Sequence, residues 1–272
     1  MDQTRPRRKP SPTVRVLLHG KEDFAAMRRA GRLAAEILDF ITPHVRPGVT
    51  TAELDKLCRE FTAARGAISA PLNYKGFPRS ICTSINDVVC HGIPGDRALE
   101  EGDIINIDVT PMVDRWHGDS SRMFLVGEVS EAARRLVDET YECMMRGIRA
   151  VRPGATLGDI GHAIQSHAEA AGYSVVRDFC GHGIGQVFHD APQVVHFGRP
   201  GHGAPLRAGM FFTIEPMINT GHYGIRILDD GWTAMAEDGS LSAQFEHTVG
   251  VTADGVEIFT LSPAGLHQPP YA

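Results

Sequence analysis

The sequence predicts an α+β fold made of two similar halves, with helices packed on one face of a largely antiparallel sheet. In both halves, segments with helical spacing of apolar residues precede segments rich in strands, which is typical of this class. The stretch Val45–Thr50 recurs as Val151–Thr156, and Gly102–Asp108 resembles Gly209–Glu215 at nearly the same offset. This offset is far longer than a solenoid unit, so we interpret the repeat as a duplicated half-domain.

The first half is expected to open with two helices. Residues 22–42 place apolar side chains at helical spacing, and Pro43 ends that helix. Thr50 or Thr51 can cap the second helix, which closes at Gly66. The proline-rich connection between the helices therefore forms a sharp turn.

The remaining elements follow in the same order. We expect strands at 78–90 with a polar break at 86–87, at 103–112 and 116–126, then helices at 130–150 and 157–171, and finally strands at 210–218, 223–228, 232–237, 243–252 and 256–260. Between the last helix and residue 210, strands and loops are expected to alternate around several glycines.

Length and composition bound the domain organisation. A chain of 272 residues with 42% hydrophobic residues can bury a sizeable core. Because the two halves are expected to interlock, we predict a single domain over residues 14–262. Residues 1–13 are basic and proline-rich, and we predict a disordered tail or, alternatively, an arm that docks on an acidic partner such as ribosomal RNA. Residues 263–272 are predicted to be an irregular tail.

Charge and cysteine content restrict the class of protein. The net charge of -6 argues against general nucleic-acid binding, and we expect no specific DNA binding. No apolar run approaches the length of a membrane span, and no apolar segment follows Arg7-Arg8 as a secretory signal requires. The 5 cysteines are scattered without a CxxC pair, which indicates reduced thiols in a cytoplasmic protein.

Asp108 and Asp119 are candidate members of one site. If Val113-Asp114 forms the two-residue turn of a hairpin, Asp108 and Asp119 lie directly opposite each other, with Cβ atoms about 5 Å apart. Two ionised carboxylates on a partly buried face repel, so they either share a proton or hold a multivalent cation between them. The simpler alternative is a pair of solvated aspartates on an edge hairpin.

Further donors favour the cation. Glu215 takes the place of Asp108 in the repeat, and Glu246 lies in another strand-like segment. His182 is flanked by glycines, which let the backbone approach closely and leave the ring exposed to the site. Oxygen donors suit hard or borderline divalent ions, and one imidazole moves the preference toward Mn, Fe(II), Co or Zn.

Seven short motifs contain or surround these donors. They are Tyr74–Pro78, Ser84–Pro94, Asn106–Thr110, His117–Asp119, Gly181–Gly185 with Phe188-His189, Thr213–Met217 and Gln244–Thr248. Together, and in this order across residues 20–261, they resemble the motifs of type I methionine aminopeptidases of the bacterial kind. The set is far more specific than any one of its members.

This resemblance implies a pita-bread fold, whose halves are related by a pseudo-twofold axis. It also implies two divalent metal ions per chain, with Co, Mn, Fe(II), Zn and Ni as candidates. Asp108 would bind one ion through both carboxylate oxygens, Asp119 and Glu246 would bridge the two ions, and His182 and Glu215 would complete the other ion's shell. A hydroxide between the ions would attack the scissile carbonyl.

The resemblance also implies roles for residues around the metals. Glu215 would carry the proton, His189 would steady the developing oxyanion, and His91 would contact the amide beside the scissile bond. The residues that would bind the substrate, with a sulfur-bearing and aromatic pocket suited to a methionine side chain, are Tyr74, Phe77, Cys82, His91, Phe188, His189 and Trp232. By position, Asn86, Val88 and Ser242 match residues that hold a monovalent cation, Na or K, in relatives.

Three positions depart from the family pattern. Phe77 stands where relatives often have Tyr, Pro71 where bacterial relatives commonly have a pocket Cys, and Asp190 where Glu is usual. None of these changes removes a metal ligand, so they bear on substrate preference.

The implied activity is removal of the initiator methionine from nascent chains whose second residue is small, by a monomeric cytoplasmic enzyme. A proline-directed peptidase of the prolidase or aminopeptidase P kind is one alternative, although these usually carry an additional N-terminal domain. A non-catalytic binding module of the same fold is another, although such modules typically lose metal ligands.

Overall fold

The computed structural model describes residues 16–271. Four α-helices form, at positions close to those predicted, and they are α1 (Lys21–Ile41), α2 (Thr51–Ala64), α3 (Glu131–Arg149) and α4 (Leu157–Ala170). Two 3₁₀ turns accompany them, η1 (Thr42–His44) and η2 (Tyr74–Gly76). The predicted tail at residues 1–13 lies outside the described residues. No helix within 16–271 is long and apolar enough to cross a membrane.

The strands form one main sheet and three small ones. The main sheet contains β2 (Cys82–Ile85), β4 (Ile104–Val109), β7 (Ser120–Leu125), β9 (Gly181–Gly183), β10 (Asp190–Val194), β11 (Phe211–Ile214), β16 (Glu246–Val251) and β17 (Val256–Ile258). The small sheets contain β1 (Ile68–Ser69), β5 (Pro111–Val113) and β6 (Trp116–His117); β8 (Ser174–Val175), β12 (Met217–Asn219) and β15 (Ser242–Gln244); and β3 (Val88–Cys90), β13 (Ile225–Ile227) and β14 (Ala234–Ala236).

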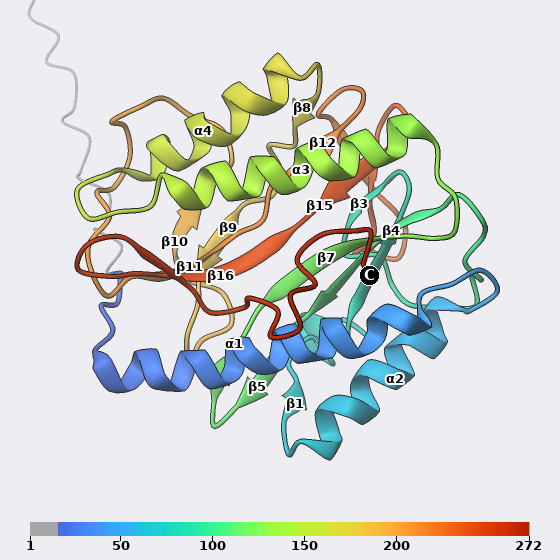
Figure 1. Cartoon of the computed structure of the whole chain (residues 1–272), viewed down its shortest axis with the longest axis horizontal. Helices are drawn as coiled ribbons and strands as arrows, with labels where there is room; N and C mark the ends of the chain where they lie inside the picture. Colours follow the sequence, from blue (N-terminus) through green and yellow to red (C-terminus); the bar gives the residue numbers. More distant parts are fainter. Residues whose placement is uncertain (1–15, 272) are drawn as a thin grey trace, which may run out of the picture.

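All strand pairs of the main sheet are antiparallel, in the order β10-β9-β11-β16-β7-β4-β2, with β17 paired to β16. Figure 1 shows α1 with α2 across one half of this sheet and α3 with α4 across the other, all in front of it. The predicted α+β class, with helices on one face of an antiparallel sheet, is confirmed.

The sequence repeat is also a structural repeat. Thr50 and Thr156 each cap a helix by accepting a hydrogen bond from the third helical residue, Glu53 or Asp159, whose carboxylate in turn accepts the N–H of the capping threonine. The glycine two residues before each cap has a positive φ, 88° at Gly48 and 86° in the second copy. The same turn therefore starts the second helix of each half.

The order of strands follows the same symmetry. The centre of the main sheet is the pair β7 and β16, flanked by β4 and β11, and then by β2 and β9. Strands β2, β4 and β7 follow α1 and α2 in the chain, whereas β9, β11 and β16 follow α3 and α4. The two halves thus meet in the middle of one continuous sheet, and no linker separates them.

Successive side chains of β4 point alternately into the apolar core and toward the opposite face of the sheet. Ile105, Ile107 and Val109 are buried in a cluster with apolar residues of α1 and α2. Asn106 and Asp108 have the other parity, and so project from the opposite side of the strand. Helices α1 and α2 therefore cover one face of β4, and the two polar residues of the strand lie on the other.

The hairpin that carries the two aspartates has a different register from the one predicted. Its turn is Asp114-Arg115, both with positive φ, and not Val113-Asp114. Val113 is β-branched and resists the left-handed conformation that such a two-residue turn requires. Asp108 consequently pairs with Ser121. Asp119 lies two residues before Ser121, so it is diagonal to Asp108 and not directly opposite.

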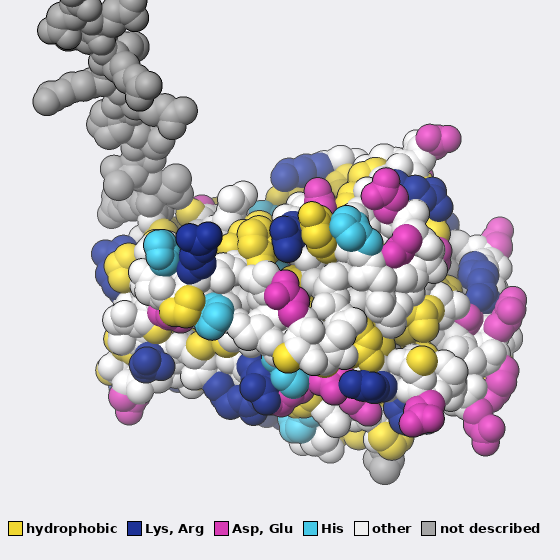
Figure 2. All heavy atoms as spheres, turned by 90° about the horizontal axis from the view of Figure 1, so that it is seen from above, with side chains coloured by type: hydrophobic (Ala, Val, Ile, Leu, Met, Phe, Trp, Pro, Cys, Tyr) yellow, Lys and Arg dark blue, Asp and Glu magenta, His cyan; other side chains and the backbone are white. Residues whose placement is uncertain are grey.

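The last residues are irregular in conformation but are attached to the core. Asp39 on α1 forms a 2.6 Å ion pair with the buried Arg122, and it also accepts a hydrogen bond from Ser262. The hydroxyl of Tyr271 donates to the carbonyl oxygen of Met123 over 2.8 Å. The charged surface seen from above in Figure 2 is mixed, with acidic and basic side chains interspersed among the described residues.

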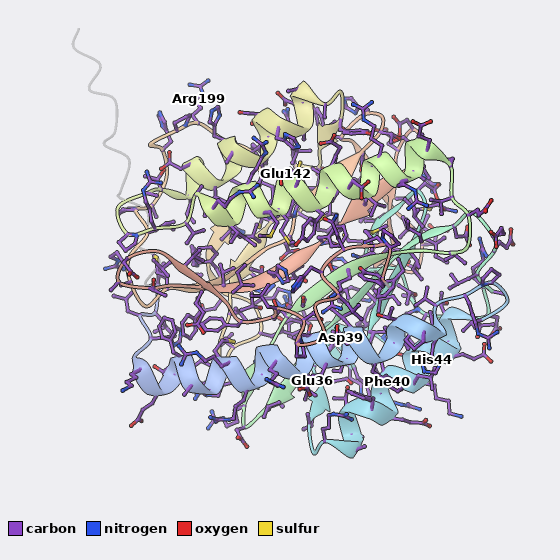
Figure 3. The ribbon with its side chains drawn as sticks, in the orientation of Figure 1. Glu36, Asp39, Phe40, His44, Glu142 and Arg199 are labelled. Carbon is purple, nitrogen blue, oxygen red and sulfur yellow. The ribbon has the colours of Figure 1, made fainter. Side chains whose placement is uncertain are left out.

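We predict that Asp39→Ala lowers the free energy of unfolding by about 3 kcal/mol or more, because Arg122 is left charged, buried and unpaired. Glu36→Ala is the matched control on the same helix (Figure 3), since it breaks an exposed pair with Arg32. That change is expected to cost less than about 1 kcal/mol in urea unfolding curves. Equal losses in the two variants would contradict a structural role for the buried pair.

Candidate metal centre and substrate pocket

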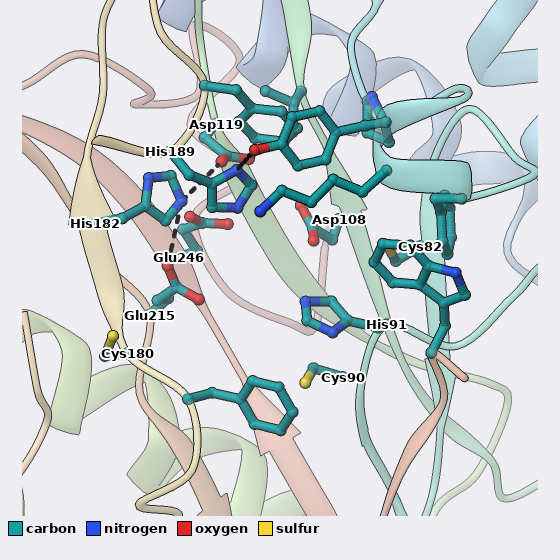
Figure 4. A pocket seen from close by; sticks show the side chains of 18 of the residues that line it. Cys82, Cys90, His91, Asp108, Asp119, Cys180, His182, His189, Glu215 and Glu246 are labelled. Atoms are coloured by element: carbon teal, nitrogen blue, oxygen red, sulfur yellow. Dashed lines mark hydrogen bonds and ion pairs between the residues drawn. The ribbon is translucent and has the colours of Figure 1, made fainter. Parts of the chain in front are cut away.

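One cavity of about 290 Å³ brings the predicted site residues together. Its lining includes the five predicted metal ligands and the seven predicted substrate-binding residues, namely Asp108, Asp119, His182, Glu215 and Glu246 with Tyr74, Phe77, Cys82, His91, Phe188, His189 and Trp232. Figure 4 shows the acidic residues and His182 converging on one part of the cavity, with His91 and Cys82 facing them.

Five neighbouring strands of the main sheet each position one of the five predicted ligands. In the order of the sheet, His182 lies on β9, Glu215 follows β11, Glu246 begins β16, Asp119 precedes β7 and Asp108 lies on β4. Adjacent strands are about 4.8 Å apart, so one donor from each strand produces a continuous row of ligands. The centre therefore spans both halves of the fold.

The donor atoms are close enough to share cations. Oxygen or nitrogen atoms of Asp119, His182 and Glu246 lie within 4.8 Å of one another. Nε2 of His182 is 3.5 Å from Oδ2 of Asp119 and 3.8 Å from Oε1 of Glu215. Nδ1 of His182 lies 3.1 Å from the carbonyl oxygen of Gly183, so it is the nitrogen that carries the proton. Nε2 is then free to act as a ligand.

The glycines around His182 have a steric cause. A Cβ atom at Gly181 would clash with the carbonyl oxygen of Thr213 on β11, and one at Gly183 would clash with that of Ala191 on β10. Only residues without side chains let β9 lie this close to both neighbours. The close packing then presents the His182 ring to the cavity.

Threonine side chains orient two of the carboxylates. The hydroxyl of Thr110 donates to Oδ1 of Asp119, and that of Thr213 donates to Oε1 of Glu215, both over 2.7 Å. The hydroxyl of Thr248 donates to the backbone carbonyl of Asp119 and accepts its N–H. Such contacts limit how far a metal-binding carboxylate can rotate.

The electrostatics of the carboxyl groups favour a cation. Burial, followed by the charge of Asp119, raises the pKa of Asp108 and of Glu246 well above their usual range, and burial raises the pKa of Glu215 to about 7. Oδ1 of Asp108 is buried and has no hydrogen-bond partner within residues 16–271. An oxygen-rich donor set with one imidazole and an unsatisfied buried oxygen fits divalent metal ions.

The other two histidines of the cavity are neutral. Burial, assisted by the neighbouring His182, lowers the pKa of His189 to about 4, and burial also lowers the pKa of His91. Nδ1 of His189 lies 3.0 Å from the hydroxyl oxygen of Tyr74. If that hydroxyl donates to Nδ1, the proton of the neutral His189 ring is on Nε2. This N–H can then donate a hydrogen bond to an oxygen atom in the cavity.

The far wall of the cavity is apolar. The Phe77 and Trp232 rings meet edge to face at 5.3 Å between centroids, and the His91 ring meets Phe179 in the same way at 5.2 Å. Pro71, one of the departures from the family pattern, also lines the cavity. The lining residues that were not predicted from the sequence are Lys75, Cys90, Thr110, Asp178, Phe179, Cys180 and Met217. Four of them lie inside quoted motifs and Cys180 directly precedes one, so closeness to a motif was the signal for these five, whereas Asp178 and Phe179 lie further from any motif.

The three residues predicted for a monovalent cation lie away from this cavity. Asn86 and Val88 line a separate pocket of about 280 Å³. The carbonyl oxygen of Asn86 accepts the N–H of Ser242 over 2.9 Å, so these two residues are in contact. Binding of Na or K there stays a prediction.

Comparisons with known proteins bear on this arrangement. The sequence model of metallopeptidase family M24 matches residues 25–253. The chain belongs to metallopeptidase family M24. Among M24 proteins it is 62% identical over 257 residues to the methionine aminopeptidase of Rickettsia prowazekii, covering 94% of this chain and 99% of that protein. Methionine aminopeptidase A of a Synechocystis strain is 60% identical over 90% of this chain and 98% of its own length.

A solved structure agrees with these M24 relatives. The crystal structure of the Rickettsia prowazekii methionine aminopeptidase matches with a TM-score of 0.90 and 61% identity, covering 91% of this chain and 100% of that one. The predicted resemblance to methionine aminopeptidases and the predicted pita-bread fold are confirmed. Within this M24 chain, the five-strand row of donors is where divalent metal would be held.

We predict that the affinity of the metal-free protein for Mn²⁺ rises with pH between about 5.5 and about 8. Below its pKa of about 7, Glu215 holds a proton and cannot act as a ligand, and above it the carboxylate is available. Isothermal titration calorimetry at several pH values, in buffers of different ionisation enthalpy, measures both the affinity and the protons released.

Two variants test the origin of this pH dependence. Glu215→Gln should weaken binding and make its pH dependence shallower, because one titrating ligand is gone. Glu142→Gln is the control, since Glu142 lies on the surface of α3 and pairs with Arg146 and Arg149 (Figure 3). Affinity independent of pH in the unmodified protein would contradict the prediction.

Proposed function

We propose that this chain is a metal-dependent aminopeptidase that removes the N-terminal methionine from polypeptides whose second residue is small. The observation that carries the proposal is the row of five buried donors facing an apolar, sulfur-bearing pocket in a single cavity. The similarity to methionine aminopeptidases over nearly the whole chain supports the same activity. Nascent polypeptides in the cytoplasm would be the substrates.

We further propose that the donors hold two divalent ions. Asp119 and Glu246 lie in the middle of the row, where each carboxylate can reach an ion on either side, while Asp108 lies toward one end and His182 with Glu215 toward the other. When bound, such ions supply a Lewis acid for the scissile carbonyl and lower the pKa of water to near neutrality. The sequence and the fold leave the choice among Co, Mn, Fe(II), Zn and Ni to metal availability.

The chain's own residues would handle the protons. Glu215 lies beside His182 among the donors that would hold the ions, so its carboxylate is placed to accept a proton from the attacking water and to return it to the leaving amine. The neutral His189 would donate from Nε2 to the oxyanion that develops at the carbonyl, and the Tyr74 hydroxyl would hold the ring in that tautomer.

The far wall would bind the methionine side chain. Phe77, Cys82 and Trp232 offer aromatic and sulfur surfaces that suit a flexible thioether. His91, with its positive φ of 56°, projects from the strand end between this wall and the metal centre, where it would contact the substrate amide. These apolar walls would exclude water from the side chain and favour methionine over polar residues.

The activity can be tested with short peptides on protein reconstituted anaerobically with Mn, Fe(II), Co or Zn. We expect methionine release from Met-Ala-Ser and little release from Met-Leu-Ser, because the second residue must be small. Cleavage of Ala-Pro peptides in preference to Met-Ala-Ser would instead support the proline-directed alternative.

Asp108→Asn separates an enzyme from a binding module. One neutral amide in place of a carboxylate should reduce bound metal and lower kcat at least about 100-fold if the ions are essential. Metal content is measured by mass spectrometry alongside the peptide assay. Full activity in a variant that contains no metal would contradict the proposed centre.

We predict that Phe77→Ala raises KM for methionyl peptides about tenfold, with a smaller effect on kcat, because apolar contact area with the methionine side chain is lost. Phe40→Ala is the control, since Phe40 of α1 (Figure 3) stacks on Phe61 of α2, with 4.2 Å between ring centroids, and does not line the cavity. An unchanged KM in Phe77→Ala would place the methionine side chain elsewhere.

A further inference from the structure

A buried histidine lies behind the metal centre, outside the cavity. His196 follows β10 and is 1% exposed. It does not line the cavity, and none of the motifs that predicted the site contains it. Its only hydrogen bond within residues 16–271 is to the backbone of Glu215.

The contact joins a ring nitrogen of His196 to a backbone N–H that no strand pairing holds. The backbone N–H of Glu215 donates to Nε2 of His196 over 3.1 Å. Glu215 lies in the gap between β11, which ends at Ile214, and β12, which begins at Met217, so no strand pairing positions its backbone. The imidazole therefore takes the place of the neighbouring strand at the point where the chain delivers a metal ligand.

The ring is held in one protonation state by its surroundings. Because Nε2 accepts a hydrogen bond, the proton of the neutral ring lies on Nδ1, and that atom is buried without a hydrogen-bond partner in the described residues. Burial lowers the pKa of His196 to about 3, which keeps the ring neutral. An unpaired buried donor is unfavourable, so stability alone does not account for an imidazole at this position.

We propose that His196 is a positioning residue, which fixes the backbone at Glu215 and thereby the direction of the Glu215 carboxylate. The proposal rests on the proposed role of Glu215 as metal ligand and proton carrier.

The direction of the Glu215 carboxylate depends on the position of its backbone. The hydroxyl of Thr213 holds Oε1, and the amide of Gln244 reaches Oε2 over a longer 3.4 Å. Both contacts depend on the place of the Glu215 Cα atom, since Thr213 is fixed in β11 and Gln244 is fixed in β15. A small rotation of the backbone would turn the carboxylate away from Nε2 of His182, 3.8 Å distant. Supporting contacts of this kind typically change metal affinity or activity about 10- to 100-fold.

Two polar variants of different reach test the proposal. In His196→Gln, the side-chain oxygen can take the place of Nε2 and accept the Glu215 N–H. In His196→Asn, the shorter side chain cannot reach it. We expect His196→Asn to lower kcat for Met-Ala-Ser about 10- to 100-fold and Mn²⁺ affinity about tenfold, with KM changed less than about threefold. His196→Gln should recover both quantities to within about threefold of the unmodified protein.

Thermal unfolding of both variants, with and without Mn²⁺, accompanies these measurements. A role in packing alone predicts that Gln and Asn lose stability and activity together, and equal kcat and equal Mn²⁺ affinity in the two variants would overturn the proposal. If His196→Asn does not fold, His196→Gln is compared with His196→Leu, which fills the space without an acceptor. If the unmodified protein binds Mn²⁺ but releases no methionine, the proposed activity fails, and the Mn²⁺ affinities of the variants still decide the role of His196.

Discussion

The burial of four carboxyl groups beside one imidazole is the constraint on which the rest of the structure depends. Asp108, Asp119, Glu215 and Glu246 line one cavity with His182, and burial together with the charge of Asp119 pushes the other three carboxyl groups toward their uncharged forms. Divalent cations reverse that tendency, because their charge stabilises the ionised carboxylates. The positions of these donor atoms are fixed by three kinds of contact: the threonine hydroxyls, the close packing at the glycines around His182, and the hydrogen bond to His196.

Duplication explains how one sheet can bring so many donors to one place. Each half contributes a helix pair, a capped turn and a set of strands, and the halves meet at β7 and β16. Asp108 and Glu215 come from equivalent strands of the two halves. The symmetry stops at the outer strands, because β9 carries His182 whereas Cys82 on β2 faces Asp108. This difference separates the end of the cavity that contains the proposed metal ligands from its apolar end.

Sequence reasoning predicts the parts of this protein that local pattern determines. Helix periodicity, the repeated capping turn and the apolar strands ending in carboxylates lead to the correct elements and to the residues that gather in the cavity. It fails on the register of the hairpin, because Asp114-Arg115 is not one of the usual Asn-Gly or Asp-Gly signals for a turn with positive φ at both positions. It also misses His196, whose partner is a backbone N–H of a residue 19 positions away, a contact that has no signature in side-chain type.

The placement of one donor on each of five adjacent strands has a consequence for how the protein matures. Ligands from β4 and β16 come together only when the two halves have joined, so a partly assembled sheet offers an incomplete set of donors. Metal held by these donors would bind the finished fold and not its precursors, and would stabilise that state by mass action. A chain in which β9 or β16 opens locally would lose one of the proposed ligands, His182 or Glu246. Retention of metal at the proposed centre would therefore report whether both halves are correctly joined.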